Sequence, residues 1–293
     1  MSTILCIGSV LWDVIGTCGD PMDAGADRPG HITRHPGGVA LNVAMALKIQ
    51  GLSPALLSAV GRDDEGHDLI RACDTLGLQT AYIHRPKDLP TDRYMAIEDP
   101  RGLVAAIAHA HTLEATGAAI LTPLRDGRLG DARKPFTGLV ALDGNLTHDL
   151  LADMSQSPLL ARADLRVAPA SPGKALRLRP FVPHDRAVLY VNLQEACTLA
   201  DATYATAHDA AQALLSQGAA RVLVTDGPRA ACDGDANGMI SATPPTVTAA
   251  RITGAGDTFM ATHIAAELSG ADRQSSLSTA LSAAATHVSG SPT

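Results

Sequence analysis

The stretch from Leu41 to Gly77 reads LNVAMALKIQGLSPALLSAVGRDDEGHDLIRACDTLG and changes its apolar pattern twice. Its first ten residues have helical spacing, and Gly51 supplies a stop signal directly after them. Residues 55–60 form a short apolar run, which is typical of a buried strand. After a polar turn, residues 67–76 return to helical spacing. This alternation predicts a parallel β-sheet whose strands are joined by crossover helices.

Further apolar runs extend the pattern along the chain. Strands are predicted at residues 4–8, 138–143, 187–192 and 221–225. The last three runs end in polar residues, at Asp143, at Asn192 and at Thr225-Asp226-Gly227. Open α/β sheets bind ligands just past the carboxyl ends of their strands. We therefore expect an α/β protein with a ligand site at that edge.

Two segments interrupt the alternation, at about residues 12–36 and 92–110. The second alternates around Asp99-Pro100-Arg101-Gly102, a strong turn signal, and predicts a β-hairpin. The first is rich in Gly, Asp and Pro, with short β-like pieces at either end. Together they predict a small β-sheet standing off a single domain of residues 1–293. A lid over a site and a plain surface flap are both compatible with this pattern.

Composition excludes several classes of protein. Apolar residues make up 46% of the 293 residues but aromatic residues only 3%, so the core must be aliphatic. The net charge of -7 argues against binding to nucleic acid or to an anionic membrane. Five widely spaced cysteines predict neither a disulfide framework nor a zinc site. Without a long apolar run or a basic N-terminal stretch, we expect a soluble, cytoplasmic protein.

The segment Thr253-Gly254-Ala255-Gly256-Asp257-Thr258-Phe259 precedes an apolar helix at residues 260–268. Small residues let the backbone approach a ligand closely, and the free amides of a helix N-terminus can face a phosphoryl group. A carboxylate in the first turn can accept a proton from a hydroxyl. The alternative is a glycine-rich turn with an aspartate as helix cap.

This segment resembles the C-terminal signature of the PfkB, or ribokinase, family of carbohydrate kinases. The family's N-terminal signature is matched by residues 36–44, PGGVALNVA, and the resemblance runs from Ile4 to about Val288. It implies a ribokinase-like three-layer α/β/α sandwich with a mostly parallel central sheet and a small β-sheet lid. It also implies ATP with Mg²⁺ as the phosphoryl donor and a sugar or nucleoside hydroxyl as the acceptor.

The resemblance assigns roles to individual residues. Asp257 would be the catalytic base, and the amides of Gly254, Ala255 and Gly256 would stabilise the transferring phosphoryl group. The residues implied in substrate binding are Asp13, Gly37, Gly38, Asn42 and Asn145. A turn acid at Asp13 and a helix cap at Asn42 are the structural alternatives.

Nucleotide and metal residues follow the later strands. The sequence Asn192-Leu193-Gln194-Glu195 matches the family's Asn-x-x-Glu motif. Glu195 would act on Mg²⁺ through water, which Mg²⁺ gives up reluctantly. The residues implied in ATP binding are Asn192, Thr225, Gly227 and Gly256. The alternative for the Asn-x-x-Glu motif is a helix-start Asn with an exposed Glu.

Two positions depart from the family pattern. Arg251 stands where many members carry an Asp that helps to hold a monovalent cation, so potassium binding is doubtful. Either its guanidinium replaces the ion's charge, or it is an exposed Arg at a strand end. Ala230 stands where the family usually carries Gly, so the turn of the nucleotide loop can differ there.

The acceptor is a finer inference. Residues 91–94, 104–114, 143–146 and 168–175 resemble pseudouridine kinases, which implies phosphorylation of the ribose 5′-hydroxyl. A ribokinase- or fructokinase-like sugar kinase, another nucleoside kinase and a non-catalytic ligand-binding relative are the alternatives. The roles of His109, His111 and Lys174 stay open. Lid sheets in this family often pair between subunits, which makes a homodimer through the lid a further expectation.

Overall fold

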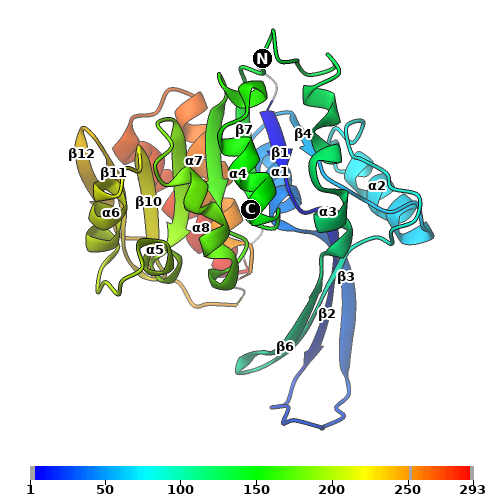
Figure 1. Ribbon diagram of the computed structural model, residues 1–293. Coiled ribbons are helices and arrows are strands. Elements are labelled where there is room, and N and C mark those ends of the chain that lie inside the picture. The colour runs from blue at the N-terminus through cyan, green and yellow to red at the C-terminus, as the bar shows by residue number, and fades with distance from the viewer. Residues whose placement is uncertain (1–3, 251–252, 291–293) are drawn as a thin grey trace.

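The computed structural model describes residues 4–250 and 253–290 and contains two β-sheets (Figure 1). The larger sheet has eight strands in the order β12-β11-β10-β9-β8-β7-β1-β4. Its strands are β1 (Ile4–Ile7), β4 (Pro54–Leu57), β7 (Leu139–Asp143), β8 (Asp164–Ala168), β9 (Ala187–Asn192), β10 (Arg221–Asp226), β11 (Arg229–Asp235) and β12 (Gly238–Ala242). The pairs from β4 to β10 are parallel, and β11 and β12 add an antiparallel edge. The predicted α/β class with a mostly parallel sheet is confirmed.

Helices cover both faces of this sheet. One face carries α1 (Val39–Ile49), α2 (Asp64–Thr75), α7 (Ala255–Leu268) and α8 (Arg273–Val288). The other carries α4 (His148–Ser155), α5 (Leu193–Ala200), α6 (Ala207–Ser216) and the 3₁₀ segments η1 (Gly117–Leu124), η2 (Pro158–Leu160) and η3 (Pro172–Phe181). The short helix α3 (His111–Thr116) precedes η1. No helix among these residues is both long and apolar enough to cross a membrane.

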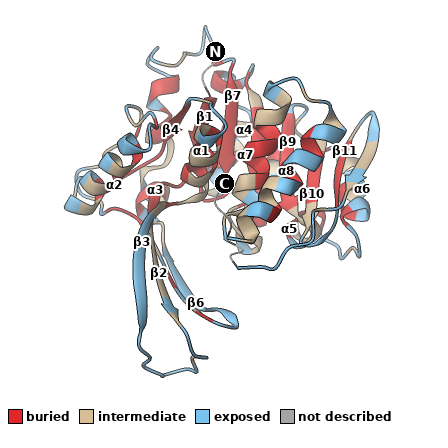
Figure 2. Cartoon of the chain, turned by 180° about the vertical axis from the view of Figure 1, so that it is seen from behind, coloured by how far each residue is buried: buried red, intermediate tan, exposed pale blue. Residues whose placement is uncertain are grey.

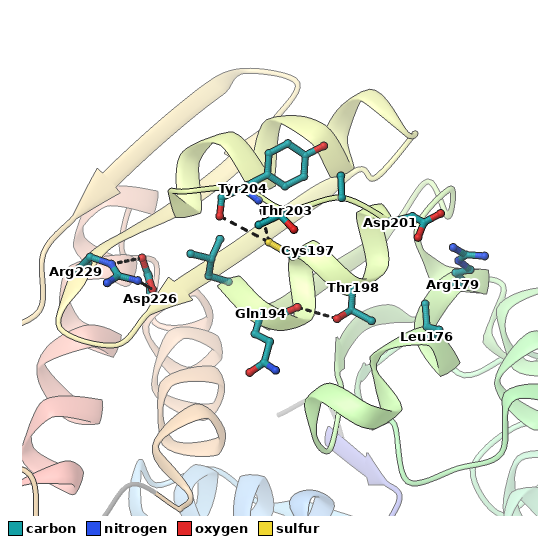
Figure 3. A pocket seen from close by; sticks show the side chains of 12 residues that line it. Leu176, Arg179, Gln194, Cys197, Thr198, Asp201, Thr203, Tyr204, Asp226 and Arg229 are labelled. Carbon is teal, nitrogen blue, oxygen red and sulfur yellow. Dashed lines mark hydrogen bonds and ion pairs between the residues drawn. The ribbon is translucent and has the colours of Figure 1, made fainter.

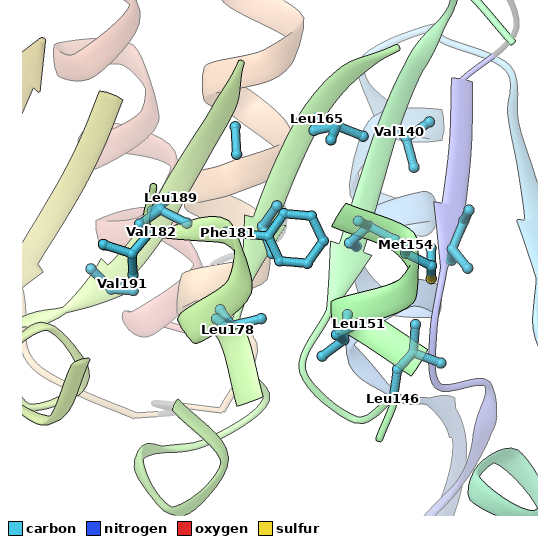
Figure 4. Packing of buried hydrophobic residues seen from close by; sticks show 14 of the residues in the cluster. Val140, Leu146, Leu151, Met154, Leu165, Leu178, Phe181, Val182, Leu189 and Val191 are labelled. Carbon is cyan, nitrogen blue, oxygen red and sulfur yellow. The ribbon is translucent and has the colours of Figure 1, made fainter. Parts of the chain in front are cut away.

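Successive side chains of the central strands enter two separate apolar layers. In β1, Leu5 and Ile7 join the layer beneath η3 and α5, whereas Ile4 and Cys6 join the layer beneath α1 and α7. This alternation is the period of two that a strand imposes on its side chains. Figure 4 shows the first layer, in which Phe181 lies among aliphatic side chains. The three-layer sandwich and the aliphatic core are therefore both confirmed.

The smaller sheet extends from the body as a paddle (Figures 1 and 2). Its order is β3-β2-β5-β6, formed by β2 (Leu11–Cys18), β3 (Gly30–Gly37), β5 (Arg93–Asp99) and β6 (Gly102–His109). These strands lie in the two segments predicted for the lid, and β5 with β6 is the predicted hairpin. Its base is anchored on α2, because the Trp12 indole donates to the Glu65 carbonyl at 2.9 Å.

The element boundaries differ from the prediction in a few places. Helix α2 begins at Asp64 rather than at residue 67, because the Asp63 side chain accepts the Gly66 amide as an N-cap. Strand β4 ends at Leu57 rather than at residue 60, and Ala59 keeps only an isolated bridge. Strand β8 was not predicted, because Arg166 interrupts its apolar run. That guanidinium is buried against Asp164 and Glu267.

Candidate active site

Asp143, at the carboxyl end of β7, binds the neighbouring strand end and the start of α1. Its Oδ2 accepts from the Ser9 amide at 2.7 Å, the Ser9 hydroxyl at 2.8 Å and the Ala40 amide at 3.0 Å. A Cβ atom on Gly8 would lie 2.2 Å from the Asp143 Cγ. The turn after β1 therefore requires glycine there. Sequence reasoning noted Asp143 as a strand-end acid but missed it as an organising residue.

Helices α1 and α7 begin next to each other at this edge of the sheet. Each follows a glycine in the left-handed region, Gly38 with φ 97° and Gly254 with φ 85°, and neither has a side-chain cap. The Asn42 Nδ2 donates to the Asp257 Oδ2 at 2.8 Å. Two motifs that lie 215 residues apart in the chain are thus joined directly.

The first amides of α1 are already bonded, because the Val39 amide donates to the Ser9 hydroxyl and the Ala40 amide to Asp143. The uncapped N-terminus of α7 instead leaves backbone amides available to a ligand.

The surroundings of Asp257, the predicted base, raise its affinity for a proton. Asp257 keeps part of its surface open, yet burial raises its pKa to about 7. The charges of Asp143 and Asp13 raise it further, and the hydrogen bond from Asn42 opposes them. A carboxylate with a pKa near neutrality is matched to proton transfer at that pH. The arrangement can therefore act as a general base.

Asp13 reaches the same region from the lid sheet. It lies in β2, between His35 of β3 and Tyr94 of β5 in the strand register. A Cβ atom on Gly37 would lie 2.0 Å from the Asp13 Oδ2, so this close approach requires glycine. Burial raises the pKa of Asp13 to about 6. The structure therefore brings Asp13, Gly37, Gly38, Asn42 and Asp257 together, as the sequence predicted.

Asn192 and Glu195 form a capping box at the start of α5. The Asn192 side chain accepts the Glu195 amide at 2.9 Å, and Glu195 Oε2 accepts the Asn192 amide at 2.8 Å. Glu195 is buried, so the alternative of an exposed glutamate is wrong. Burial and then the charge of Asp257 raise the pKa of Glu195 to about 7. Asp257 and Glu195 thus lie close enough to interact, and in the described part of the chain no basic side chain is seen to contact either of them.

Comparison with known families identifies this arrangement. The model of the pfkB family carbohydrate kinases matches residues 1–293. The chain belongs to the pfkB family. It is therefore an ATP-dependent phosphotransferase of the ribokinase-like type, acting on a small sugar or nucleoside.

Relatives of this pfkB-family chain include two proteins of pseudouridine metabolism. The pseudouridine kinase of Escherichia coli is 27% identical over 266 residues, which is 88% of this chain and 81% of that protein. A pseudouridine-metabolizing bifunctional protein of Schizosaccharomyces pombe is 28% identical over 158 residues, or 53% of this chain and 20% of that protein.

Solved structures share the fold of this pfkB-family chain. A ribokinase from Thermotoga maritima superposes with a TM-score of 0.80 at 19% identity, over 98% of this chain and 93% of that one. An Arabidopsis thaliana ribokinase, solved with ribose and ATP, gives 0.76 at 18% identity, over 98% and 92%. At such identities the likeness establishes the ribokinase-like fold alone.

The nucleotide loop predicted for a pfkB member follows β10. Gly227 has a φ of 54°, whereas Ala230 lies in β11 and is not among the positive-φ residues. The Arg229 guanidinium binds the Asp226 carboxylate through two contacts of 2.6 Å, so its charge is already paired. A Cβ atom on Gly256 would meet nothing within 4 Å. That side of Gly256 is therefore open, and its role in binding the nucleotide stays a prediction.

Magnesium fits this site only together with the nucleotide. In residues 4–250 and 253–290, no group of three or more acidic, histidine or cysteine side chains could hold a metal ion. Mg²⁺ is usually held by one or two carboxylates, substrate phosphates and several waters. The buried Glu195 carboxylate, with one oxygen used in the capping box, can supply such a ligand through water.

Other residues singled out from the sequence have mainly internal contacts. The Asn145 Nδ2 donates to the Ser9 hydroxyl at 2.8 Å, and its Oδ1 accepts from Lys174 Nζ at 2.6 Å. His109 and His111 lie at the base of the lid with ring centroids 5.0 Å apart. Arg251 lies outside the described residues. The role of Asn145 in substrate binding therefore remains a prediction.

A recess of about 760 Å³ lies on the outer side of α5 (Figure 3). Gln194, Cys197 and Thr198 line it, together with residues of η3 and of the loop before α6. Neither Glu195 nor Asn192 faces it. Asp226 and Arg229, from the predicted nucleotide loop after β10, also line it, whereas Asp257 and Asp13 do not.

Proposed function

We propose that this chain transfers the γ-phosphoryl group of ATP to the ribose 5′-hydroxyl of pseudouridine. The observation that carries the kinase chemistry is the hydrogen bond of 2.8 Å between Asn42 and Asp257. It joins the start of α1 to Asp257 in the first turn of α7, which supports Asp257 as the proposed base. The acceptor is supported by the E. coli pseudouridine kinase, 27% identical over 88% of this chain.

Asp257 takes the proton of the acceptor hydroxyl as the phosphoryl group is transferred. Its Oδ2 is oriented by Asn42, and its raised pKa lets it hold that proton near neutral pH. The amides at Gly254, Ala255 and Gly256 face the charge that develops on the phosphoryl oxygens. Transfer is direct and in line, so no covalent phosphoenzyme forms.

Binding groups surround this centre. Asp13, Gly37, Gly38 and Asn42 bind the hydroxyls of the acceptor, and Asn145 supports that side. Asn192, Thr225 and Gly227 bind the nucleotide. Bound ATP would supply the phosphoryl group, Mg²⁺ would neutralise its charge, and Glu195 would hold the metal through water. The lid excludes water, which prevents ATP hydrolysis.

Coupled ADP production over a panel of nucleosides and sugars tests this proposal. We expect pseudouridine to be the best acceptor, and Asp257→Asn to lower kcat by roughly 10³-fold, within the usual range for a general base. If no acceptor raises ADP release above that of Asp257→Asn, the chain is a non-catalytic ligand-binding relative. If ribose or fructose outruns pseudouridine by a wide margin, the kinase assignment survives but the acceptor is wrong.

We also propose that the lids of two copies pair while residues 1–293 act as one domain. One face of the lid is apolar and exposed, with Ile32 at 80% and Ile107 at 70% of full exposure. Both lie on the face opposite Asp13 in the strand register. Light scattering of the parent and of Ile107→Glu tests this pairing. A parent that is monomeric at micromolar concentration would refute it.

A further inference from the structure

His287, in the last turn of α8, contacts both sides of the glycine turn that precedes α7. Its Nε2 lies 2.8 Å from the Thr253 carbonyl oxygen, and its Nδ1 lies 3.2 Å from the Thr258 hydroxyl. Thr253 is the residue before Gly254, and Thr258 is the residue after Asp257. One imidazole ring therefore bridges the whole segment that carries the candidate base and the candidate phosphoryl-binding amides.

The chemistry of these contacts defines the hydrogen-bonding direction. A carbonyl oxygen only accepts, so Nε2 must carry a proton and donate to Thr253. In the neutral ring Nδ1 is then an acceptor, and the Thr258 hydroxyl donates to it. A single neutral tautomer thus satisfies both contacts. The rigid ring sets the separation between its two partners.

Other helices of the protein are fixed at their start in a different way. Helices α2, α4, α5, α6 and α8 each have a side-chain cap, from Asp63, Thr147, Asn192, Thr206 and Asp272 respectively. Helix α7 has only Gly254, which offers no side chain, and its first amides stay available to a ligand. The conformation of this turn therefore has to be fixed by a residue from another element. The His287 ring packs closely against Gly254, as a Cβ atom on that glycine would lie only 3.1 Å from the His287 Nε2.

We propose that His287 is a positioning residue that orients the amides of Gly254–Gly256 and the Asp257 carboxylate for phosphoryl transfer. The inference rests on the proposed function. It assigns His287 no contact with the acceptor or with ATP. Preorganised donors matter most when charge develops in the transition state. Loss of the ring should therefore lower kcat much more than it changes either KM.

Steady-state kinetics of His287→Ala, His287→Gln and Thr258→Val test this role, with the exposed His208→Ala on α6 as the control. We expect His287→Ala to lower kcat by about 10- to 100-fold, with KM for ATP and acceptor within about threefold. His287→Gln should recover part of kcat, because its amide can still donate to the Thr253 carbonyl. Thr258→Val removes only the second contact and should cost about two- to fivefold.

Added imidazole provides an independent readout in His287→Ala, since the lost side chain is partly open to solvent. Imidazole at tens of millimolar should raise kcat of His287→Ala and leave His208→Ala unchanged. The inference is overturned if kcat of His287→Ala matches the parent, or if KM rises while kcat holds. It is also overturned if His287→Gln, folded by circular dichroism, is no more active than His287→Ala. A parent that phosphorylates no acceptor would instead refute the proposed function.

Discussion

The two ends of α7 each carry a half-buried acidic side chain, but the two acids have opposite surroundings. At the far end Glu267 accepts from Arg166 at 2.5 Å and from Arg221 at 2.6 Å. These guanidinium groups outweigh the effect of burial and hold the pKa of Glu267 below its usual value. At the near end Asp257 has an amide partner and two acidic neighbours, and its pKa is raised to about 7.

The Glu267 end of α7 therefore contributes mainly to the stability of the fold, and the Asp257 end mainly to the proposed activity. The far end is neutralised by the chain itself, because Arg221 and Arg273 also bind Asp233, at 2.7 and 3.0 Å. At the near end, the negative charge of Asp257 and its acidic neighbours is not neutralised by the described part of the protein and would need a bound cation. The Mg²⁺ ion that the family implies beside the nucleotide would supply positive charge there. We therefore expect substitutions at the far end to change stability, and those at the near end to change activity.

Glu267→Ala should have the largest effect on the free energy of unfolding. It would leave the buried Arg166 with Asp164 and the half-buried Arg221 with Asp233 as their remaining carboxylate partners. Breaking a buried pair typically costs about 3–5 kcal/mol, and we expect the lower end of that range because both cations keep a partner. Urea unfolding of the parent and variant measures the loss. Asp185→Ala is the control, because that carboxylate is 85% exposed. A loss no larger than that of the control would mean that the far end is not held by its ion pairs.

Asp257→Asn should stabilise the fold relative to the parent, and this gain in the free energy of unfolding should increase with pH. The folded pKa of about 7 lies above the model-compound value of 3.8, so ionisation of Asp257 destabilises the fold. That cost is absent below about pH 4, grows up to pH 7 and is constant above it. Allowing for the open face of Asp257, we expect a gain on the order of 2 kcal/mol at pH 8.

Urea unfolding at pH 5 and pH 8, in EDTA and without nucleotide, measures this gain. The stabilisation by Asp257→Asn must be larger at pH 8 than at pH 5. An equal effect at both values would show that the near end of α7 carries no unneutralised charge. The comparison between the two helix ends would then fail.

Gly37→Ala extends the comparison to the acceptor side. Its methyl group would lie 2.0 Å from the Asp13 Oδ2 and must displace that carboxylate. We expect KM for the acceptor to rise about tenfold, equal to roughly 1.4 kcal/mol of lost binding, while KM for ATP stays unchanged. Gly19→Ala is the matched control, since a Cβ there meets nothing within 4 Å. Equal KM values for the two variants would remove Asp13 from the acceptor site.

Potassium should have the smallest effect. With Arg251 in place of the cation-binding acid, we expect kcat with potassium to be within about twofold of kcat with sodium at equal ionic strength. Initial rates in matched chloride salts provide the measurement. A strong rise in activity with potassium would contradict replacement of the ion by the guanidinium.

Features that depend on neighbouring residues could be predicted from the sequence, whereas contacts between distant segments could not. Strand ends and glycine turns lie in neighbouring residues, so the mostly parallel sheet and the small second sheet could be predicted from them. The three-layer sandwich and the proposed role of Asp257 came instead from the resemblance to the pfkB family. Asp143 was visible as a strand-end acid, but its bonds to Ser9 and Ala40 depend on how β1, β7 and α1 pack. The partners of Glu267 lie 46 and 101 residues away, and no local signal joins them.

The lid can be considered as a lever whose pivot lies at its base. Leu11 pairs with Gly37 and Arg93 pairs with His109 at the end of the sheet that joins the body. Asp13 is two residues from that pivot, at about 7 Å, whereas Cys18 is about 23 Å away at the strand rise of about 3.3 Å. A rotation of about 15° would move the tip by about 6 Å and Asp13 by about 2 Å. Such a rotation would therefore displace the tip of the lid widely while the Asp13 carboxylate stays almost in place.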